Sequence, residues 1–356
     1  MNSSERIKKV LKGEIPDRVP ICEICFWGKT IERWKKEGLP ENVDIYDFFE
    51  MDRITFLYYK YGFYLERKTL EETEEYLIYR DEYGNILKDW KPESPNFGVP
   101  SYISHPLKNK YDWEKMKERL NPGEERIPDN FFEYYKSSRK KGDFIVLTIE
   151  EPAWFVLQDT FGFENGLPLL IEEKDFVLEI MEKVTGFNLR MCQFILDKGI
   201  KPDALWMFSD LCYKNGMFFS PKIFKEIVQP FHKEIKNFCK KNNLFLIFHC
   251  DGYIKEFIPL LIEEGIDAIQ PIEARCGNDV REYKKIFGDK ITLFGNISSD
   301  ILSLKKEDIK KEIEGKIKVA KEKGRYIFHS DHSVPSTVSF ENYKYAIEIV
   351  KEIGKY

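Results

Sequence analysis

The segment His249-Cys250-Asp251-Gly252 places an imidazole, a thiol and a carboxylate side by side after the apolar run 244–248. Side chains alternate along a strand, so we expect His249 and Asp251 to point to one face and Cys250 to the other. A neutral imidazole and a carboxylate two residues apart can bind one metal ion. The alternative is a strand-end histidine that hydrogen-bonds to the adjacent aspartate without a metal.

Other side chains could complete such a site, because they follow apolar runs of the same kind. We expect the ligands of a zinc ion to be drawn from His249, Asp251, Glu273 and His332, since three protein ligands and one open position are typical of catalytic zinc. Asp210 is a candidate general base or substrate anchor, and the alternative is a carboxylate that caps a turn or a helix.

Two adjacent carboxylates, Glu150 and Glu151, precede Pro152. Glu150 is a candidate catalytic residue, whereas Glu151 is expected to stabilise the N-terminus of a following helix. Trp27 and Trp154 lie near the ends of predicted strands and are candidates for the wall of a substrate pocket.

The elements that must position these residues alternate along the chain. Apolar runs with the character of strands occupy 19–26, 54–58, 144–149, 204–208, 244–248, 267–270, 291–294 and 326–328. Helical periodicity is found over 5–12, 29–38, 175–198, 221–241, 254–264, 278–286, 306–323 and 340–353. Strands that alternate with helices over short connections form a parallel sheet. We therefore predict an α/β fold, a (β/α)8 TIM-type barrel, as one domain over 1–356, with β-hairpins inserted at 62–105.

The predicted strands end in polar residues, and in a parallel barrel these ends meet at the active-site face. The residues are Glu23, Glu150, Ser209, Asp210, Tyr213, Lys214, Asn215, His249, Asp251, Gln270, Glu273, Cys276, Asn296, His329, Asp331 and His332. This repetition predicts an enzyme, with Tyr213, Lys214 and Asn215 as candidate substrate-binding residues. No Gly-x-Gly-x-x-Gly follows a predicted strand, which argues against a dinucleotide-binding sheet.

The composition excludes several partners. Among 356 residues, 56 are Lys or Arg and 61 are Asp or Glu, and the signs are interspersed, so we expect neither nucleic acid nor an anionic membrane as partner. No run of about 18 apolar residues could span a membrane, and the polar N-terminus does not resemble a signal peptide. Seven scattered cysteines suit a reducing cytoplasm. A homodimer is a further hypothesis for the assembly.

The sequence resembles the uroporphyrinogen decarboxylase superfamily, a barrel family that also contains methyltransferases acting with corrinoid proteins. The resemblance covers nearly the whole chain in order. Its motifs are Pro16-Asp17-Arg18-Val19-Pro20, Thr30-Ile31-Glu32-Arg33-Trp34, Glu37-Gly38-Leu39-Pro40, Gly162-Phe163-Glu164, Tyr213-Lys214-Asn215-Gly216, His249-Cys250-Asp251-Gly252, Asp331-His332-Ser333-Val334-Pro335 and Phe340-Glu341-Asn342-Tyr343.

The departures from the family patterns bear on the activity. Decarboxylases of this family carry an Arg-Gln-Ala-Gly-Arg segment that grips the tetrapyrrole carboxylates, and here the segment 26–30 has no arginine. The corrinoid-linked methyltransferases bind zinc through a His-x-Cys-Gly motif and a later Cys. In this sequence His249 matches the histidine, Asp251 replaces the first cysteine and His332 falls near the second.

The resemblance therefore implies a zinc site with harder ligands, suited to polarising an oxygen or nitrogen on a small methyl donor. The methyl group would pass to the Co(I) of a corrinoid carried by a separate protein, with Asp210 or Glu150 handling the proton. One alternative is a metal-free decarboxylase, of uroporphyrinogen or of another small acid, using Asp210 and His332. A non-catalytic binding protein on an old enzyme scaffold is the third reading.

Overall fold

The computed structural model describes residues 1–92, 94 and 99–356, so part of the predicted hairpin region, 93 and 95–98, lies outside the described residues. Its main sheet has seven parallel strands in the order β1-β6-β7-β10-β11-β12-β13. Their bounds are β1 (Ile54–Leu57), β6 (Phe144–Glu150), β7 (Ala204–Phe208), β10 (Phe245–His249), β11 (Ala268–Gln270), β12 (Thr292–Phe294) and β13 (Tyr326–Ile327).

The segment 19–26 lies between the two edges of this sheet and closes the barrel. Ile21 forms a parallel bridge with Phe328 beside β13, and its carbonyl accepts a 2.7 Å hydrogen bond from the Asp52 amide next to β1. The predicted TIM-type α/β barrel is confirmed. The segment itself is not a regular strand, because Pro20 has no amide to donate and the Ile24 amide bonds to the His329 ring instead.

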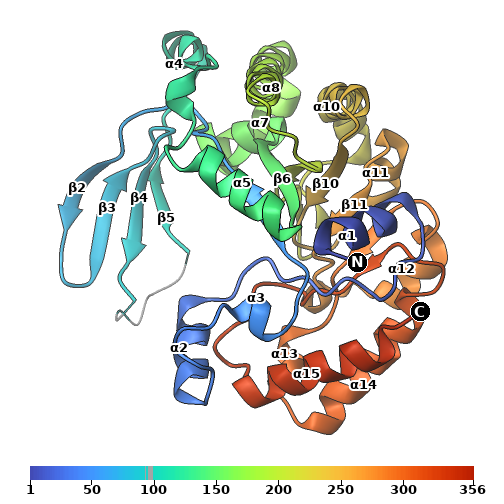
Figure 1. Ribbon diagram of the computed structural model, residues 1–356. Coiled ribbons are helices and arrows are strands. Elements are labelled where there is room, and N and C mark those ends of the chain that lie inside the picture. Colours follow the sequence, from blue (N-terminus) through green and yellow to red (C-terminus); the bar gives the residue numbers. More distant parts are fainter. Residues whose placement is uncertain (93, 95–98) are drawn as a thin grey trace.

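Helices cover the outside of the barrel (Figure 1). Six of them follow the strands β6, β7, β10, β11, β12 and β13 in turn: α8 (Lys174–Asp197), α10 (Gln229–Lys241), α11 (Ile258–Glu264), α12 (Val280–Phe287), α14 (Lys306–Ala320) and α15 (Phe340–Ile353). The others are α1 (Ser3–Lys12), α2 (Gly28–Lys36), α3 (Ile45–Phe48), α4 (Lys110–Met116), α5 (Phe131–Lys141), α6 (Pro152–Trp154), α7 (Phe163–Glu172), α9 (Pro221–Ile223) and α13 (Ser299–Leu302). The continuous helix predicted over 221–241 is instead interrupted by a π-helix, η4 (Phe224–Val228), just before Pro230, which lacks the amide of a regular helical ladder.

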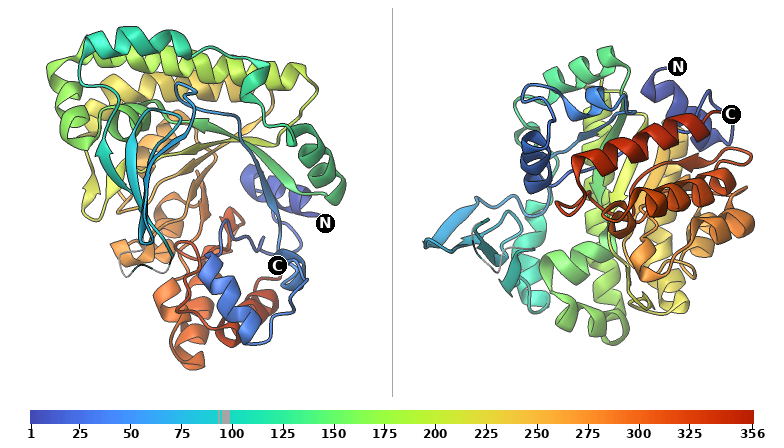
Figure 2. Two further views of the ribbon diagram at one scale, coloured as in Figure 1. Left: turned by 90° about the vertical axis from the view of Figure 1, so that its left-hand side faces the viewer. Right: turned by 90° about the horizontal axis from the view of Figure 1, so that it is seen from below.

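A four-stranded antiparallel sheet occupies the region in which the sequence predicts hairpins. It consists of β2 (Lys68–Glu72), β3 (Tyr76–Arg80), β4 (Ile86–Trp90) and β5 (Ser101–Ser104). Figures 1 and 2 show that it stands to one side of the barrel. In the turn between β3 and β4, Asp81 accepts hydrogen bonds from the amides of Tyr83, Gly84 and Asn85. This turn brings Tyr83 to the cavity described below.

Asp52 joins the closing segment to the rest of the barrel. It is 1% exposed, and its carboxylate accepts hydrogen bonds from the Ile21 amide at 2.9 Å and from Arg18 at 2.7 Å. The same carboxylate pairs with Arg6 of α1.

None of the helices in the described part of the chain combines the length and the apolar character that a membrane-spanning helix needs.

Replacing Asp52 with alanine should lower the free energy of unfolding by about 3 kcal/mol, because breaking a buried pair leaves an uncompensated charge. Denaturant titration followed by circular dichroism measures the change. The control is Glu41→Ala, whose pair with Lys35 is exposed and should contribute less than about 1 kcal/mol. Equal stability of the Asp52 and Glu41 variants would contradict the closing role of Asp52.

Candidate active site

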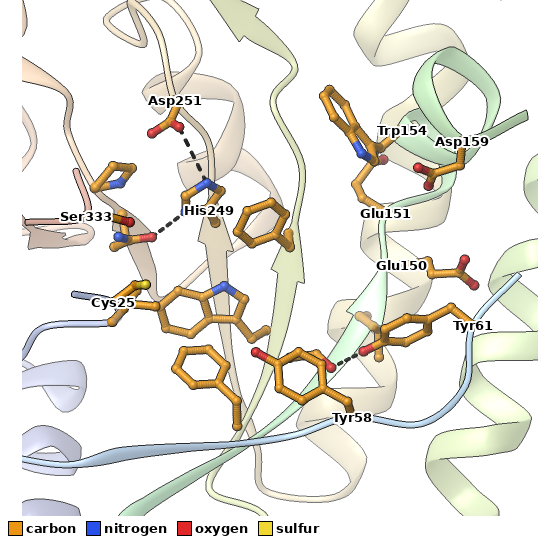
Figure 3. Close-up of a pocket in the computed structure, with 18 of the residues that line it drawn as sticks. Cys25, Tyr58, Tyr61, Glu150, Glu151, Trp154, Asp159, His249, Asp251 and Ser333 are labelled. Atoms are coloured by element: carbon orange, nitrogen blue, oxygen red, sulfur yellow. Dashed lines mark hydrogen bonds and ion pairs between the residues drawn. The ribbon is translucent and has the colours of Figure 1, made fainter. Parts of the chain in front are cut away.

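A cavity of about 540 Å³ opens at the carboxyl ends of the barrel strands. The strand register builds its wall in one layer: Glu150 of β6 is the partner of Phe208 of β7, Phe208 of His249 of β10, and His249 of Gln270 of β11. Phe56 and Trp206 line its apolar part. Figure 3 shows His249 and Asp251 on one side of the cavity and Glu150, Trp154 and Asp159 on the other.

Asp210, His249 and Asp251 form a cluster with ligand atoms within 4.8 Å of one another. His249 Nε2 lies 3.6 Å from Asp210 Oδ1 and 3.9 Å from Asp251 Oδ2. His332 Nε2 lies 3.6 Å from Asp251 Oδ2. The arrangement therefore offers two carboxylates and two imidazoles, a donor set that suits a divalent transition metal.

The orientation of the His249 ring is fixed by its neighbours. Its Nδ1 lies 2.5 Å from Gln270 Oε1, and since an amide oxygen only accepts, Nδ1 carries the proton. In the neutral imidazole, the form that binds a metal, Nε2 then has a free lone pair, and this atom faces the two carboxylates. The Phe208 ring stacks on the imidazole, with centroids 4.0 Å apart and planes 8° apart. An outer hydrogen bond that sets the tautomer is typical of metal-binding histidines.

Two buried atoms of this cluster lack a hydrogen-bond partner among the described residues: His249 Nε2 and Asp251 Oδ1. A buried polar atom without a partner costs about 1–3 kcal/mol, and burial also raises the pKa of Asp251. A divalent cation would satisfy both atoms and offset the charge of the carboxylates. The residues present therefore fit a metal ion.

The structure assigns different positions to two residues of the predicted set. Asp210, expected to handle a proton or anchor substrate, lies inside the ligand cluster and accepts the Asp251 amide at 2.9 Å. Glu273, expected to bind the metal, lies outside that cluster. Its Oε2 accepts hydrogen bonds from the Gly252 amide at 2.9 Å and the Cys276 thiol at 3.0 Å, so it holds the turn after β10 in place.

Of the candidate substrate-binding residues, one lines the cavity and the other four lie outside it. Trp154 lines the cavity. Trp27 does not line it, because it precedes α2 with 47% of its surface exposed. Tyr213, Lys214 and Asn215 are also outside it, in the exposed hairpin of β8 (Cys212–Tyr213) and β9 (Gly216–Met217).

That hairpin packs against the turn that follows Asp251. We call Asp210, His249 and Asp251 the metal-type cluster. Gly252 has φ +91, and a Cβ there would lie 2.8 Å from the Tyr213 backbone. The Tyr253 amide donates a 2.9 Å hydrogen bond to the Tyr213 carbonyl. The glycine of the His249–Gly252 segment is therefore required by this close approach.

Glu150, a predicted catalytic residue, lies across the cavity from the cluster (Figure 3). Its Oε1 accepts hydrogen bonds from Tyr83 Oη at 2.7 Å and the Gly62 amide at 3.2 Å. Burial raises the pKa of Glu150 to about 7. Asp159, on the π-helix η3 (Phe155–Thr160), lines the same wall, and burial raises the pKa of its carboxyl well above the usual value. Asp159 was not among the site residues predicted from the sequence, although a carboxylate in the mainly apolar stretch 152–161 was an available signal.

Glu151 and His232 form a buried network behind the cavity. Glu151 caps α6 by accepting the amides of Ala153 and Trp154, as the sequence predicts. His232 Nε2 lies 2.8 Å from Glu151 Oε1, and its Nδ1 lies 3.0 Å from Glu264 Oε2. Burial lowers the pKa of His232, but the two glutamates outweigh it and raise the value to about 10. The imidazolium thus compensates the charge of Glu151.

Glu23 and His329 form a second buried pair at the cavity. Their carboxylate oxygen and Nε2 lie 3.3 Å apart. Burial raises the pKa of Glu23 to about 8, while burial lowers that of His329 to about 3. His329 Nε2 accepts a 3.1 Å hydrogen bond from the Ile24 amide, so this nitrogen carries no proton. Near neutral pH the imidazole is therefore uncharged and the proton resides on Glu23.

An α/β barrel with carboxylates and imidazoles around a cavity at the strand ends is typical of barrel enzymes. The family model for uroporphyrinogen decarboxylase (URO-D) matches residues 100–353, and the chain belongs to this family. It is 27% identical over 214 residues, 59% of its length, to a uroporphyrinogen decarboxylase of Hydrogenobaculum sp. (strain Y04AAS1), and the match spans only 55% of that relative.

A solved structure supports the fold. The chain superposes on a methyltransferase from Methanosarcina mazei with a TM-score of 0.65, covering 99% of each chain at 17% sequence identity. At that identity the likeness extends to the fold alone.

Replacing Glu23 with glutamine should change how stability depends on pH. Between pH about 4.5 and about 8 the folded wild type retains the Glu23 proton while the unfolded chain releases it, so stability falls as pH rises across this window. The variant lacks this term. Relative to wild type it should therefore gain at least about 1.4 kcal/mol between pH 5 and pH 8.

Denaturant unfolding at a series of pH values measures this difference. The exposed Glu164 of α7 provides the control, since Glu164→Gln should run parallel to the wild type. A Glu23→Gln curve parallel to the wild type would show that Glu23 carries no raised pKa.

Proposed function

We propose that the protein is a metal-dependent methyltransferase that removes a methyl group from a small substrate and passes it to the Co(I) of a corrinoid on a separate protein. Zinc is the metal that we expect. The observation that carries the proposal is a pair of buried atoms that have no hydrogen-bond partner among the described residues. They are His249 Nε2 and Asp251 Oδ1, and their residues form a cluster with Asp210 at the cavity.

The ligands would be His249, Asp251 and Asp210, with His332 close enough to Asp251 to join them. Such an ion supplies Lewis-acid polarisation of an oxygen or nitrogen that carries the methyl group. Loss of the methyl group leaves a lone pair on that atom, which must take up a proton. Of the two predicted proton carriers, Asp210 lies among the ligands and Glu150 lies across the cavity from them (Figure 3), so this proton would come from water.

The alternative function is decarboxylation, the activity in the name of the Hydrogenobaculum relative. The described residues that line the cavity include no Lys and no Arg. Recognition of a polycarboxylate such as uroporphyrinogen depends on cationic side chains, so the charge of the cavity favours the methyltransferase. A decarboxylase of a smaller acid is tested by the same experiment.

We expect the purified wild type to bind zinc and to methylate free cob(I)alamin when a methyl donor is present. His249→Ala and Asp251→Ala should lose the metal and the activity, because each removes a ligand. Gln270→Ala keeps all ligands but frees the imidazole, so it should weaken zinc binding about 10- to 100-fold. Elemental mass spectrometry and the absorbance change of the corrinoid provide the readouts.

His105→Ala is the matched control, since His105 bonds to Asn85 outside the cluster. It should keep the metal and the activity. A wild type that binds no zinc, is not stimulated by it and releases CO2 from an acid would overturn the proposal in favour of a decarboxylase.

A further inference from the structure

We propose that the cavity side opposite the metal-type cluster binds a cationic nitrogen, so that the substrate is a small organic cation. We call this side the acidic wall, formed by Glu150, Asp159, Trp154, Tyr61 and Tyr83. The cation site rests on the geometry of this wall. Its connection with methyl transfer rests on the function proposed above.

The first support is the charge of the cavity. Four carboxylates line it, and no Lys or Arg does so among the described residues. Two of the four carboxylates have partners within the protein. Asp251 belongs to the metal-type cluster, and Glu151 pairs with His232. Glu150 and Asp159 are left without an ion pair in the described part of the chain.

The second support is an unpartnered atom that is independent of the charge count. Glu150 is only 6% exposed, and the hydrogen bonds that its carboxyl group accepts from Tyr83 and Gly62 both end on Oε1. Its Oε2 is buried and has no hydrogen-bond partner among the residues that the structure describes. A ligand with an N–H group or a positive charge would satisfy this atom, whereas a carboxylate ligand would add repulsion.

Arg126, a buried cation whose charge acts on Glu150, forms no ion pair with that carboxyl group. Arg126 is 1% exposed, and its charge lowers the pKa of Glu150 without overcoming the effect of burial. Its guanidinium donates to four backbone carbonyls, those of Lys60, Gly62, Arg119 and Asn121. Across the described residues Arg126 forms no ion pair with a carboxylate within 4.0 Å, so the carboxyl group of Glu150 remains available to a ligand. A bound cation would itself favour the ionised form of that group.

The third support is the aromatic part of the wall. Trp154, Tyr61 and Tyr83 line the cavity beside the two carboxylates. Aromatic faces attract organic cations, and the attraction is larger in a site shielded from water. Carboxylates combined with aromatic rings thus favour an ammonium group over a neutral or an anionic one.

The position of the acidic wall, opposite the metal-type cluster, predicts how a bound substrate would be oriented in the cavity. Glu150 and Asp159 lie on one side in Figure 3, and His249 and Asp251 lie on the other. A cation held at the wall would place the remainder of a small molecule toward His249. The substrate class is therefore a compact molecule with a cationic nitrogen at one end and a methylated oxygen or nitrogen at the other.

The test compares two probes of nearly the same shape, choline and its uncharged analogue 3,3-dimethyl-1-butanol. Isothermal titration calorimetry on the full chain, without any corrinoid, gives both affinities. We expect choline to bind at least about ten-fold more tightly. Glu150→Gln and Asp159→Asn should each reduce choline binding at least about ten-fold and leave the alcohol within about two-fold.

Glu164→Gln, an exposed carboxylate removed from α7, is the control and should leave both affinities unchanged. If Glu150→Gln fails to fold, as judged by thermal melting, Asp159→Asn carries the test. Choline that fails to bind, or binds no better than the alcohol, overturns the proposal. So does a choline affinity that both folded variants retain.

The outcomes separate this proposal from the function proposed above. Choline selectivity in a protein without zinc or methyl transfer would support the cation site and contradict the methyltransferase. Zinc and methyl transfer without choline selectivity would do the reverse.

Discussion

The hydrogen bond between His249 Nδ1 and Gln270 Oε1 is the interaction on which the site depends. The parallel register of β10 and β11 makes the two residues partners, and the next pairing places Phe208 against the imidazole ring. With the proton fixed on Nδ1, the Nε2 lone pair faces Asp210 and Asp251. Asp52 helps to close the barrel and thereby supports its sheet. Because the register of that sheet sets the tautomer of His249, barrel closure also affects the candidate metal site.

The same register separates two kinds of carboxylate. Glu150 lies in the layer that contains His249, two strands away, so the cavity has the metal-type cluster on one side and Glu150 with Asp159 on the other. Burial raises the pKa of Glu150 and Asp159, whereas the charge of Glu151 is compensated by His232. In the described part of the chain Glu150 and Asp159 thus line the cavity without an ion pair, and carboxyl groups with a shifted pKa in a cavity are typical of functional sites.

The sequence predicted the barrel because the alternation of strands and helices has few topological solutions, and it placed the polar residues at one end of the strands. It also paired His249 with Asp251 through the alternation of side chains. It could not place Glu273 or Tyr213, since their directions depend on the turn at Gly252, whose φ and close contact with Tyr213 are properties of the folded backbone. Asp159 escaped because a π-helix, not a regular element, turns it toward the cavity.

The most direct test of the account is a crystal structure of the protein soaked with zinc, with anomalous data collected at the zinc edge. The account predicts one anomalous peak at the cavity, about 2.0–2.2 Å from His249 Nε2 and from the carboxylates of Asp251 and Asp210. A peak only elsewhere, or no peak while His249 Nε2 bonds to a neighbouring carboxyl group, would contradict it.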